Sequence, residues 1–194
     1  VAAGTVCRQL LRALGIEVSG YVRAVGGAED KGEYAFEELS RRSADLMMMD
    51  AEAEKRAKQV IDDCAARGDT CGGVLELRVK GLKSGFGSCM TYAEKLDARL
   101  IAALMSVQAI KGAEVGLGFG VAARCGSGVH DEIFYDETRG YYRKTNRAGG
   151  IEGGMSNGEE IVLRAAMKPI PTLMKGLETV DYRTHEAVRA ATER

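Results

Sequence analysis

Apolar residues recur along the chain with two different periods, and each period predicts one kind of element. In residues 3–14 they return every three or four positions, which predicts an amphipathic helix that ends at Gly15. In residues 16–24 the apolar residues Ile16, Val18, Val22 and Ala24 alternate with Glu17, Ser19, Tyr21 and Arg23, which predicts a half-buried strand. A polar loop rich in glycine follows over residues 26–32.

The same two periods divide the next part of the chain. Residues 34–49 favour a helix ending in three methionines, a cluster more typical of core filling than of a metal site. Asp50 is a plausible N-cap for another helix that closes at Gly68. In residues 75–80 the apolar side chains alternate with charged ones, so we expect a strand with one face toward solvent.

Further elements are predicted in the second half of the chain. A helix is expected over residues 92–107, a strand interrupted by glycines over 110–119, a hairpin over 133–142 and a half-buried strand over 161–167. Half-buried strands of this kind favour antiparallel sheets with one face covered by helices. The predicted fold class is therefore α+β, and without a tandem repeat or linker we expect residues 1–194 to form a single domain.

Composition and charge exclude several classes of protein. The net charge is −1, so we expect no binding of nucleic acid or anionic membrane, and anion binding must come from a local site. No apolar run reaches the roughly 20 residues that span a bilayer. Five cysteines and two histidines, without metal-ligand spacing, indicate free thiols in a reducing cytoplasm rather than zinc or disulfides.

The first candidate site is the glycine turn, residues 146–158. Its glycines allow the backbone to approach a ligand and turn N–H groups toward an anion, and Arg147, Ser156 and Asn157 could add donors. The alternative is a glycine-rich turn between two sheets, which the pattern alone favours. Neither the P-loop nor the dinucleotide fingerprint is present.

The second candidate is the proline loop, residues 168–172, which contains the only two prolines of the chain. Proline fixes φ, so this loop is stiff, with a lysine at one end and a threonine at the other. Such a loop suits a phosphate group, whereas the alternative is simply a rigid exit from a strand. A third candidate, His130 beside Asp131, allows general acid chemistry but is more typical of an exposed loop histidine.

Two long stretches resemble chorismate synthase. They are residues 96–116 (Leu-Asp-Ala-Arg-Leu-Ile-Ala-Ala-Leu-Met-Ser, then Ala-Ile-Lys-Gly-Ala-Glu-Val-Gly after two residues) and residues 145–158, from Thr-Asn-Arg-Ala-Gly-Gly-Ile to Gly-Gly-Met-Ser-Asn-Gly. The resemblance implies a β-α-β sandwich with antiparallel sheets and flanking helices, assembled as a homotetramer. It also implies an anti-1,4-elimination of phosphate from 5-enolpyruvylshikimate 3-phosphate that yields chorismate and requires reduced FMN.

The resemblance also assigns residues to the cofactor. The positions that match flavin contacts are Gly128, Val129, Gly153, Lys168, Pro169, Ile170, Pro171, Thr172 and Arg194. Arg194 is assigned to the substrate as well. Several of these positions lack the polar side chains that the family more often carries there, which leaves Lys168 and Thr172 as the side chains best suited to donate hydrogen bonds.

The catalytic residues are unknown from this chain. By the resemblance, the family's catalytic histidines and its substrate-binding arginines fall before Val1, and a functional aspartate falls after Arg194. We therefore expect a core fragment of a longer chain that is inactive alone. An alternative is a fragment that only binds flavin or oligomerises.

A third hypothesis is a flavin oxidoreductase that consumes NADPH, but no nicotinamide fingerprint is present. For a chorismate synthase the sequence leaves open whether the protein reduces its own flavin with NADPH or relies on a separate reductase.

Overall fold

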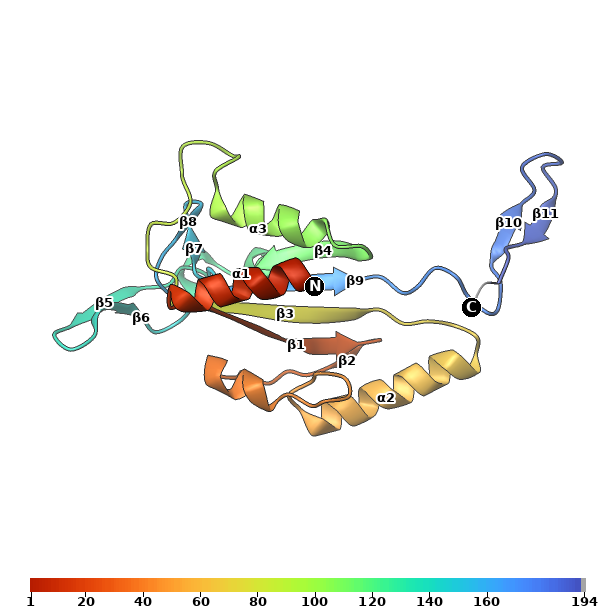
Figure 1. Ribbon diagram of the computed structural model, residues 1–194, viewed down its shortest axis with the longest axis horizontal. Coiled ribbons are helices and arrows are strands. Elements are labelled where there is room, and N and C mark those ends of the chain that lie inside the picture. Colours follow the sequence, from red (N-terminus) through yellow and green to blue (C-terminus); the bar gives the residue numbers. More distant parts are fainter. Residues whose placement is uncertain (193–194) are drawn as a thin grey trace.

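A five-stranded antiparallel sheet forms the centre of the computed structural model, which describes residues 1–192 (Figure 1). The strand order is β2–β1–β3–β9–β4. The three central strands are β1 (Glu17–Val25), β3 (Gly73–Lys80) and β9 (Ile161–Met167). The edges are β2 (Ala28–Glu29) and β4 (Ile110–Val115). Every neighbouring pair is antiparallel, as the alternating apolar pattern predicts.

Within residues 1–192, three α-helices accompany the sheet. They are α1 (Ala2–Ala13), α2 (Ala51–Ala66) and α3 (Leu96–Met105). The Asp50 side chain accepts a hydrogen bond from the Glu52 backbone N–H, which confirms the predicted N-cap of α2. The helix expected over residues 92–107 is shorter than predicted, and within residues 1–192 no helix is long and apolar enough to cross a membrane.

Short helices and hairpins complete the fold. The 3-10 helices are η1 (Phe36–Arg41), η2 (Gly118–Ala123) and η3 (Gly126–Gly128). Separate two-stranded hairpins are formed by β5 (Ile133–Asp136) with β6 (Gly140–Arg143), β7 (Ile151–Glu152) with β8 (Met155–Ser156), and β10 (Glu178–Val180) with β11 (Ala187–Arg189). Helices together with antiparallel sheets confirm the α+β class.

One face of the sheet packs against α3 through apolar side chains. Ile161 and Leu163 of β9 are buried there with Ile151, and Leu96 and Leu100 of α3 pack against them. Burying such side chains stabilises the fold by about 1.5–3 kcal/mol each. The apolar stripe predicted for this helix is therefore its core face.

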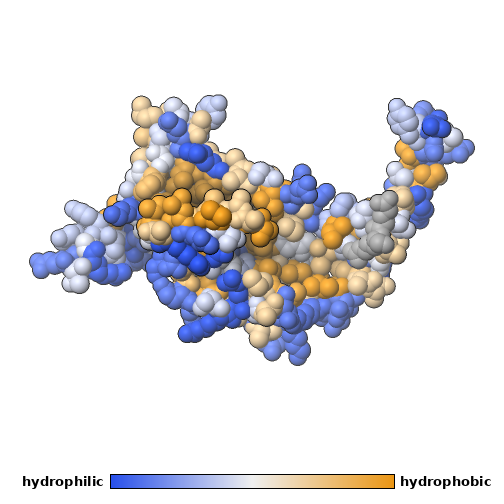
Figure 2. Space-filling view, viewed as in Figure 1, coloured by the Kyte–Doolittle hydropathy of each residue, from blue (hydrophilic) through white to orange (hydrophobic). Residues whose placement is uncertain are grey.

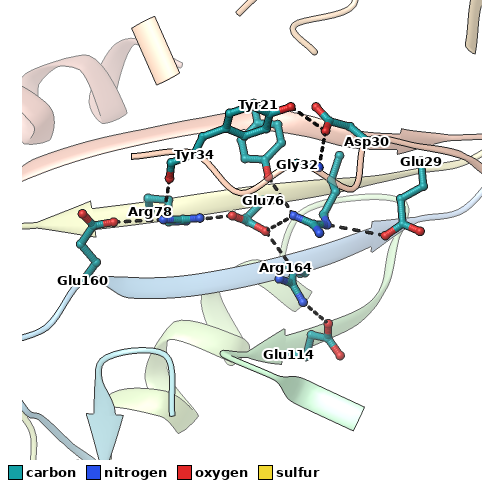
Figure 3. A network of polar contacts seen from close by, with 11 residues as sticks. Tyr21, Glu29, Asp30, Gly32, Tyr34, Glu76, Arg78, Glu114, Glu160 and Arg164 are labelled. Carbon is teal, nitrogen blue, oxygen red and sulfur yellow. Dashed lines mark hydrogen bonds and ion pairs between the residues drawn. The ribbon is translucent and has the colours of Figure 1, made fainter. Parts of the chain in front are cut away.

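The opposite face of the sheet is polar and buried, although the pattern in residues 75–80 predicted that it faces solvent. Glu76 of β3 has no exposed surface. Its carboxylate accepts hydrogen bonds from Arg23 at 3.1 Å, Arg78 at 2.8 Å and Arg164 at 2.9 Å, so three strands meet at one anion (Figure 3). Burial by itself raises the pKa of Glu76, but the hydrogen bonds from Arg164 and Arg78 outweigh burial and lower it.

A loop rather than the predicted helix covers that polar face. Of residues 34–49, only η1 is helical. The buried Asp30 carboxylate accepts hydrogen bonds from the Gly32 N–H and the Tyr34 hydroxyl (Figure 3). It also accepts the Asp50 N–H, so the segment folds back on itself. Side-chain bonds of this kind compete with helix formation, and they explain why local propensity fails here.

The apolar side of α1 is exposed, although the helix forms where the pattern predicts it. Val6, Leu10 and Leu14 keep 67%, 63% and 66% of their surface exposed. In Figure 2 a band of hydrophobic residues lies over α1. A contiguous apolar patch on one side of a helix is typical of an interaction surface.

Candidate functional site

The glycine turn contains two kinds of glycine. Gly150 has a φ of 77°, and a Cβ there would lie 2.5 Å from the Glu160 carbonyl oxygen, so only glycine fits. Gly153 has a φ of 60°, but nothing lies within 4 Å of where its Cβ would be. Packing therefore explains Gly150, whereas Gly153 faces open space at the tip of the β7–β8 hairpin.

The polar side chains of the glycine turn are used internally. The Ser156 hydroxyl donates to the Lys83 carbonyl at 2.6 Å and accepts from the Phe86 N–H. The Asn157 amide donates to Glu152 at 2.8 Å. The Arg147 guanidinium contacts the His130 carbonyl at 3.5 Å. These three predicted donors hold the turn together.

Asp131 shapes the start of the same turn. Its buried carboxylate accepts the Thr145 hydroxyl at 2.6 Å and the N–H groups of Arg147 and Ala148, both at 2.9 Å. Burial raises the pKa of Asp131, but the bonds from Ala148, Thr145 and Arg147 together outweigh burial and lower it. The residue next to His130 is thus a structural anchor, while His130 itself is exposed.

Gly128 and Val129 lie in and just after η3. The Gly128 N–H donates to the Cys125 carbonyl at 2.8 Å, and the Val129 N–H donates to the Gly126 carbonyl at 2.9 Å. Neither residue carries a polar side chain, and their backbone donors are occupied by this short turn. A flavin contact at these two positions stays a prediction.

The proline loop is exposed and attached through its backbone. The Lys168 N–H donates to the Ala109 carbonyl at 2.8 Å, and the Ile170 carbonyl accepts the Thr70 hydroxyl at 2.7 Å. All five residues of the loop are exposed. The cation of Lys168 and the hydroxyl of Thr172 are therefore accessible, as an anionic ligand requires.

One chain does not bring the two candidate loops together. The glycine turn precedes β9 and the proline loop follows it, so they lie at opposite ends of the strand (Figure 1). Seven residues of β9 separate them by roughly 20 Å. Arg194 lies outside the described residues.

A cavity of about 540 Å³ lies between α3, β4 and η2. Its lining is mostly apolar, with Lys95, Asp97 and Glu114 as the charged members. Of the predicted cofactor residues, none of the eight that lie within residues 1–192 lines it. Within residues 1–192 no cluster of three or more histidine, cysteine or acidic side chains is suited to a metal ion.

The sequence interpretation missed the arginine cluster on the polar face of the sheet. Arg164 also reaches Glu114 at 3.5 Å, and both side chains line a cavity of about 370 Å³ together with Arg23. The available signal was a charged residue at every second position of β3, matched by arginines in β1 and β9. Alternation shows which residues share a face, but not whether a loop covers it.

The fold and these loops define an α+β protein with an exposed, cationic, proline-stiffened loop suited to an anionic ligand. The family model described as chorismate synthase matches residues 1–194. The chain belongs to the chorismate synthase family.

Individual relatives agree with this assignment. The chain is 52% identical to the chorismate synthase of Geobacter sulfurreducens and 48% identical to that of Caldicellulosiruptor saccharolyticus, covering 100% of this chain and 52% of each relative. A crystal structure of chorismate synthase superposes with a TM-score of 0.80 at 39% identity, over 88% of this chain and 54% of that one. The chain thus spans about half the length of the curated relatives that it matches.

Proposed function

We propose that the whole protein is a chorismate synthase, a lyase that eliminates phosphate from 5-enolpyruvylshikimate 3-phosphate with reduced FMN as cofactor. The observation that carries this proposal is the match to chorismate synthases along the entire chain, at 52% identity in the Geobacter relative. The proposal concerns the whole protein because the chain covers only half of that relative's length.

The residues described above fit an anionic nucleotide in part. Lys168 and Thr172 supply an accessible cation and hydroxyl on a stiff loop, and Gly153 leaves open space for a planar group. Reduced FMN supplies electron density to the reacting substrate when it is bound. The role of this chain is to hold and orient the cofactor and to stabilise negative charge with fixed donors.

We further propose a homotetramer, in which the glycine turn of one subunit and the proline loop of another lie at one flavin. The separation of the loops along β9 supports a site shared between subunits, because one chain places them at opposite ends of the strand. The exposed apolar face of α1 supports association. Five free cysteines favour a cytoplasmic location.

Phosphate release tests the activity. The complete protein is incubated without oxygen, with chemically reduced FMN and 5-enolpyruvylshikimate 3-phosphate, and phosphate and chorismate are measured. We expect equal amounts of both products and no release with oxidised FMN. Absence of phosphate under reducing conditions would refute the enzymatic assignment.

The role of Gly153 is tested by a matched pair of substitutions. Asparagine tolerates positive φ, and both Gly153 and Gly140 have positive φ with nothing within 4 Å of a Cβ. Gly153→Asn should raise the Kd for FMN by about tenfold or more, equivalent to about 1.4 kcal/mol, because the new side chain fills the proposed contact. Gly140→Asn should leave the Kd unchanged. Equal effects of the two changes would remove Gly153 from the site.

A second candidate function applies to the 194 residues on their own: flavin binding or association without turnover. The exposed α1 face favours it, since an isolated chain with this patch is expected to associate. Sedimentation and FMN titration of the isolated chain, beside the phosphate assay, separate this possibility from full activity.

A further inference from the structure

The proline loop rests against a turn formed by residues 68–72, between α2 and β3. The Thr70 hydroxyl donates to the Ile170 carbonyl at 2.7 Å. Just beyond the loop, the Lys175 N–H donates to the Gly68 carbonyl at 3.2 Å, and the Lys175 ammonium pairs with Asp69. Two segments about 100 residues apart in sequence are therefore linked by three polar contacts.

Gly72 allows this close approach. A Cβ at Gly72 would collide with the Met167 carbonyl oxygen and lie 3.1 Å from the Cδ of Pro169. The obstacles are a backbone oxygen and a proline ring, neither of which can rotate away. The absence of a side chain at Gly72 therefore lets the start of the loop lie against the turn.

The other side of the loop is held by the residue before β4. The Ala109 carbonyl accepts the Lys168 N–H at 2.8 Å, and Ala109 itself has a φ of 70°. Left-handed backbone is unfavourable for alanine by roughly 1–2 kcal/mol, and such strain is found where neighbouring structure enforces it. Lys168 is thus fixed by Ala109 on one side of the loop, and Ile170 is fixed by Thr70 on the other.

We propose that Thr70 is a positioning residue for the cofactor loop: it holds the Ile170 carbonyl so that Lys168 and Thr172 keep the geometry in which they bind the phosphate-bearing part of the flavin. This inference rests on the proposed function. Thr70 touches neither cofactor nor substrate, and it acts only through the loop. Fixing a binding loop in advance raises affinity because less freedom is lost on binding.

The test compares three variants of the complete protein: Thr70→Val, Thr70→Ser and Thr5→Val. Valine keeps the shape of threonine without the hydroxyl, and serine keeps the hydroxyl. Thr5 of α1 is the matched control, because its hydroxyl also donates to a backbone carbonyl, that of Val1. FMN affinity is measured by titration, and backbone hydrogen exchange is measured without FMN. Exchange reports loop docking even if the protein binds no flavin.

Thr70→Val should raise the Kd for FMN by about three- to tenfold, as expected for one lost hydrogen bond, and should speed exchange of residues 168–175 while β3 and β9 keep wild-type protection. Thr70→Ser should restore affinity to within about twofold of wild type, and Thr5→Val should change neither readout. A Thr70→Val protein with wild-type affinity overturns the positioning role, whether or not exchange rises. A wild-type protein that binds no FMN overturns the proposed function itself, and the exchange data then decide docking alone.

Discussion

The two loops that flank β9 differ in how the fold uses them. In the glycine turn, Gly150 has no room for a side chain, the Ala148 N–H donates to the Asp131 carboxylate, and the Ser156 hydroxyl donates to the Lys83 carbonyl. In the proline loop every residue is exposed, and the two backbone bonds described above attach it. The contrast teaches that a run of glycines reports packing at most of its positions, whereas the groups left free for a ligand lie where packing is sparse.

The largest expected difference in stability is between alanine substitutions at two positions of the glycine turn. Gly150→Ala combines positive φ with a backbone clash, so we expect a loss of about 2–5 kcal/mol in the free energy of unfolding. Gly153→Ala carries only the cost of positive φ, about 1–2 kcal/mol. Denaturant titration of both variants measures the difference. Equal losses would show that the turn is not packed as described.

The next largest loss of stability is expected when Asp131, which anchors the glycine turn, is replaced. Asp131→Ala deprives one hydroxyl and two backbone N–H groups of their acceptor, and we expect a loss of about 3 kcal/mol. Chemical denaturation at neutral pH measures it. Thr145→Val, which removes a single partner, should cost about 1 kcal/mol. A loss below that of the threonine variant would contradict the anchoring role.

Acid should weaken the glycine turn because it protonates the buried Asp131 carboxylate. The pKa of Asp131 is lowered in the fold, so its stabilising contribution is complete above its unfolded pKa near 4 and is lost as pH falls through the lower folded value. Glu76 changes stability in the same direction. Unfolding measured between pH 6 and pH 2 should show a steep loss below about pH 4 that Asp131→Asn reduces. If stability depends on pH in Asp131→Asn as it does in the wild type, Asp131 does not contribute to the loss of stability in acid.

In the proline loop, at the other end of β9, substitution of Lys168 should weaken FMN binding and leave the stability of the fold nearly unchanged. Lys168→Ala should weaken FMN affinity by about 1–3 kcal/mol, the range for a lost charged hydrogen bond. Because the side chain is exposed, the free energy of unfolding should stay within about 0.5 kcal/mol of wild type. Calorimetric titration checks the first value and denaturant titration the second. An FMN affinity of Lys168→Ala equal to wild type would remove Lys168 from the site.

The smallest expected effect is a gain in stability. Ala109→Gly relieves positive φ at the residue that accepts the Lys168 N–H, and glycine costs some chain entropy in return, so we expect stabilisation of about 1 kcal/mol or less. A shift of the thermal midpoint to higher temperature would agree with this. A clear decrease would mean that Ala109 is not strained.

Much of the fold was predictable because periodicity reports local geometry. The strands over residues 16–24 and 161–167, the Asp50 cap and the hairpin over residues 133–142 form as expected. The helix over residues 34–49 does not, because the buried Asp30 carboxylate ties the segment into a loop. The burial of Glu76 could not be predicted either. Alternating charged residues indicate a face exposed to solvent, and the loop that covers this face comes from another part of the chain.

The candidate site was predictable only in part. Stiffness and charge identify the proline loop from its own residues, and the structure places it in the open. The anchors at Thr70 and Ala109 come from distant parts of the chain, and no local pattern links them to Ile170 or Lys168. Long-range contacts of this kind depend on tertiary packing rather than on sequence spacing.

In the homotetramer proposed above, one flavin is held by the glycine turn of one subunit and by the proline loop of another. Hydrogen exchange of the complete protein with and without FMN tests this most directly. We expect FMN to slow exchange both around Gly153 and across residues 168–172, with no change in the β5–β6 turn. Protection of only one of the two loops, or of neither, would contradict the shared site.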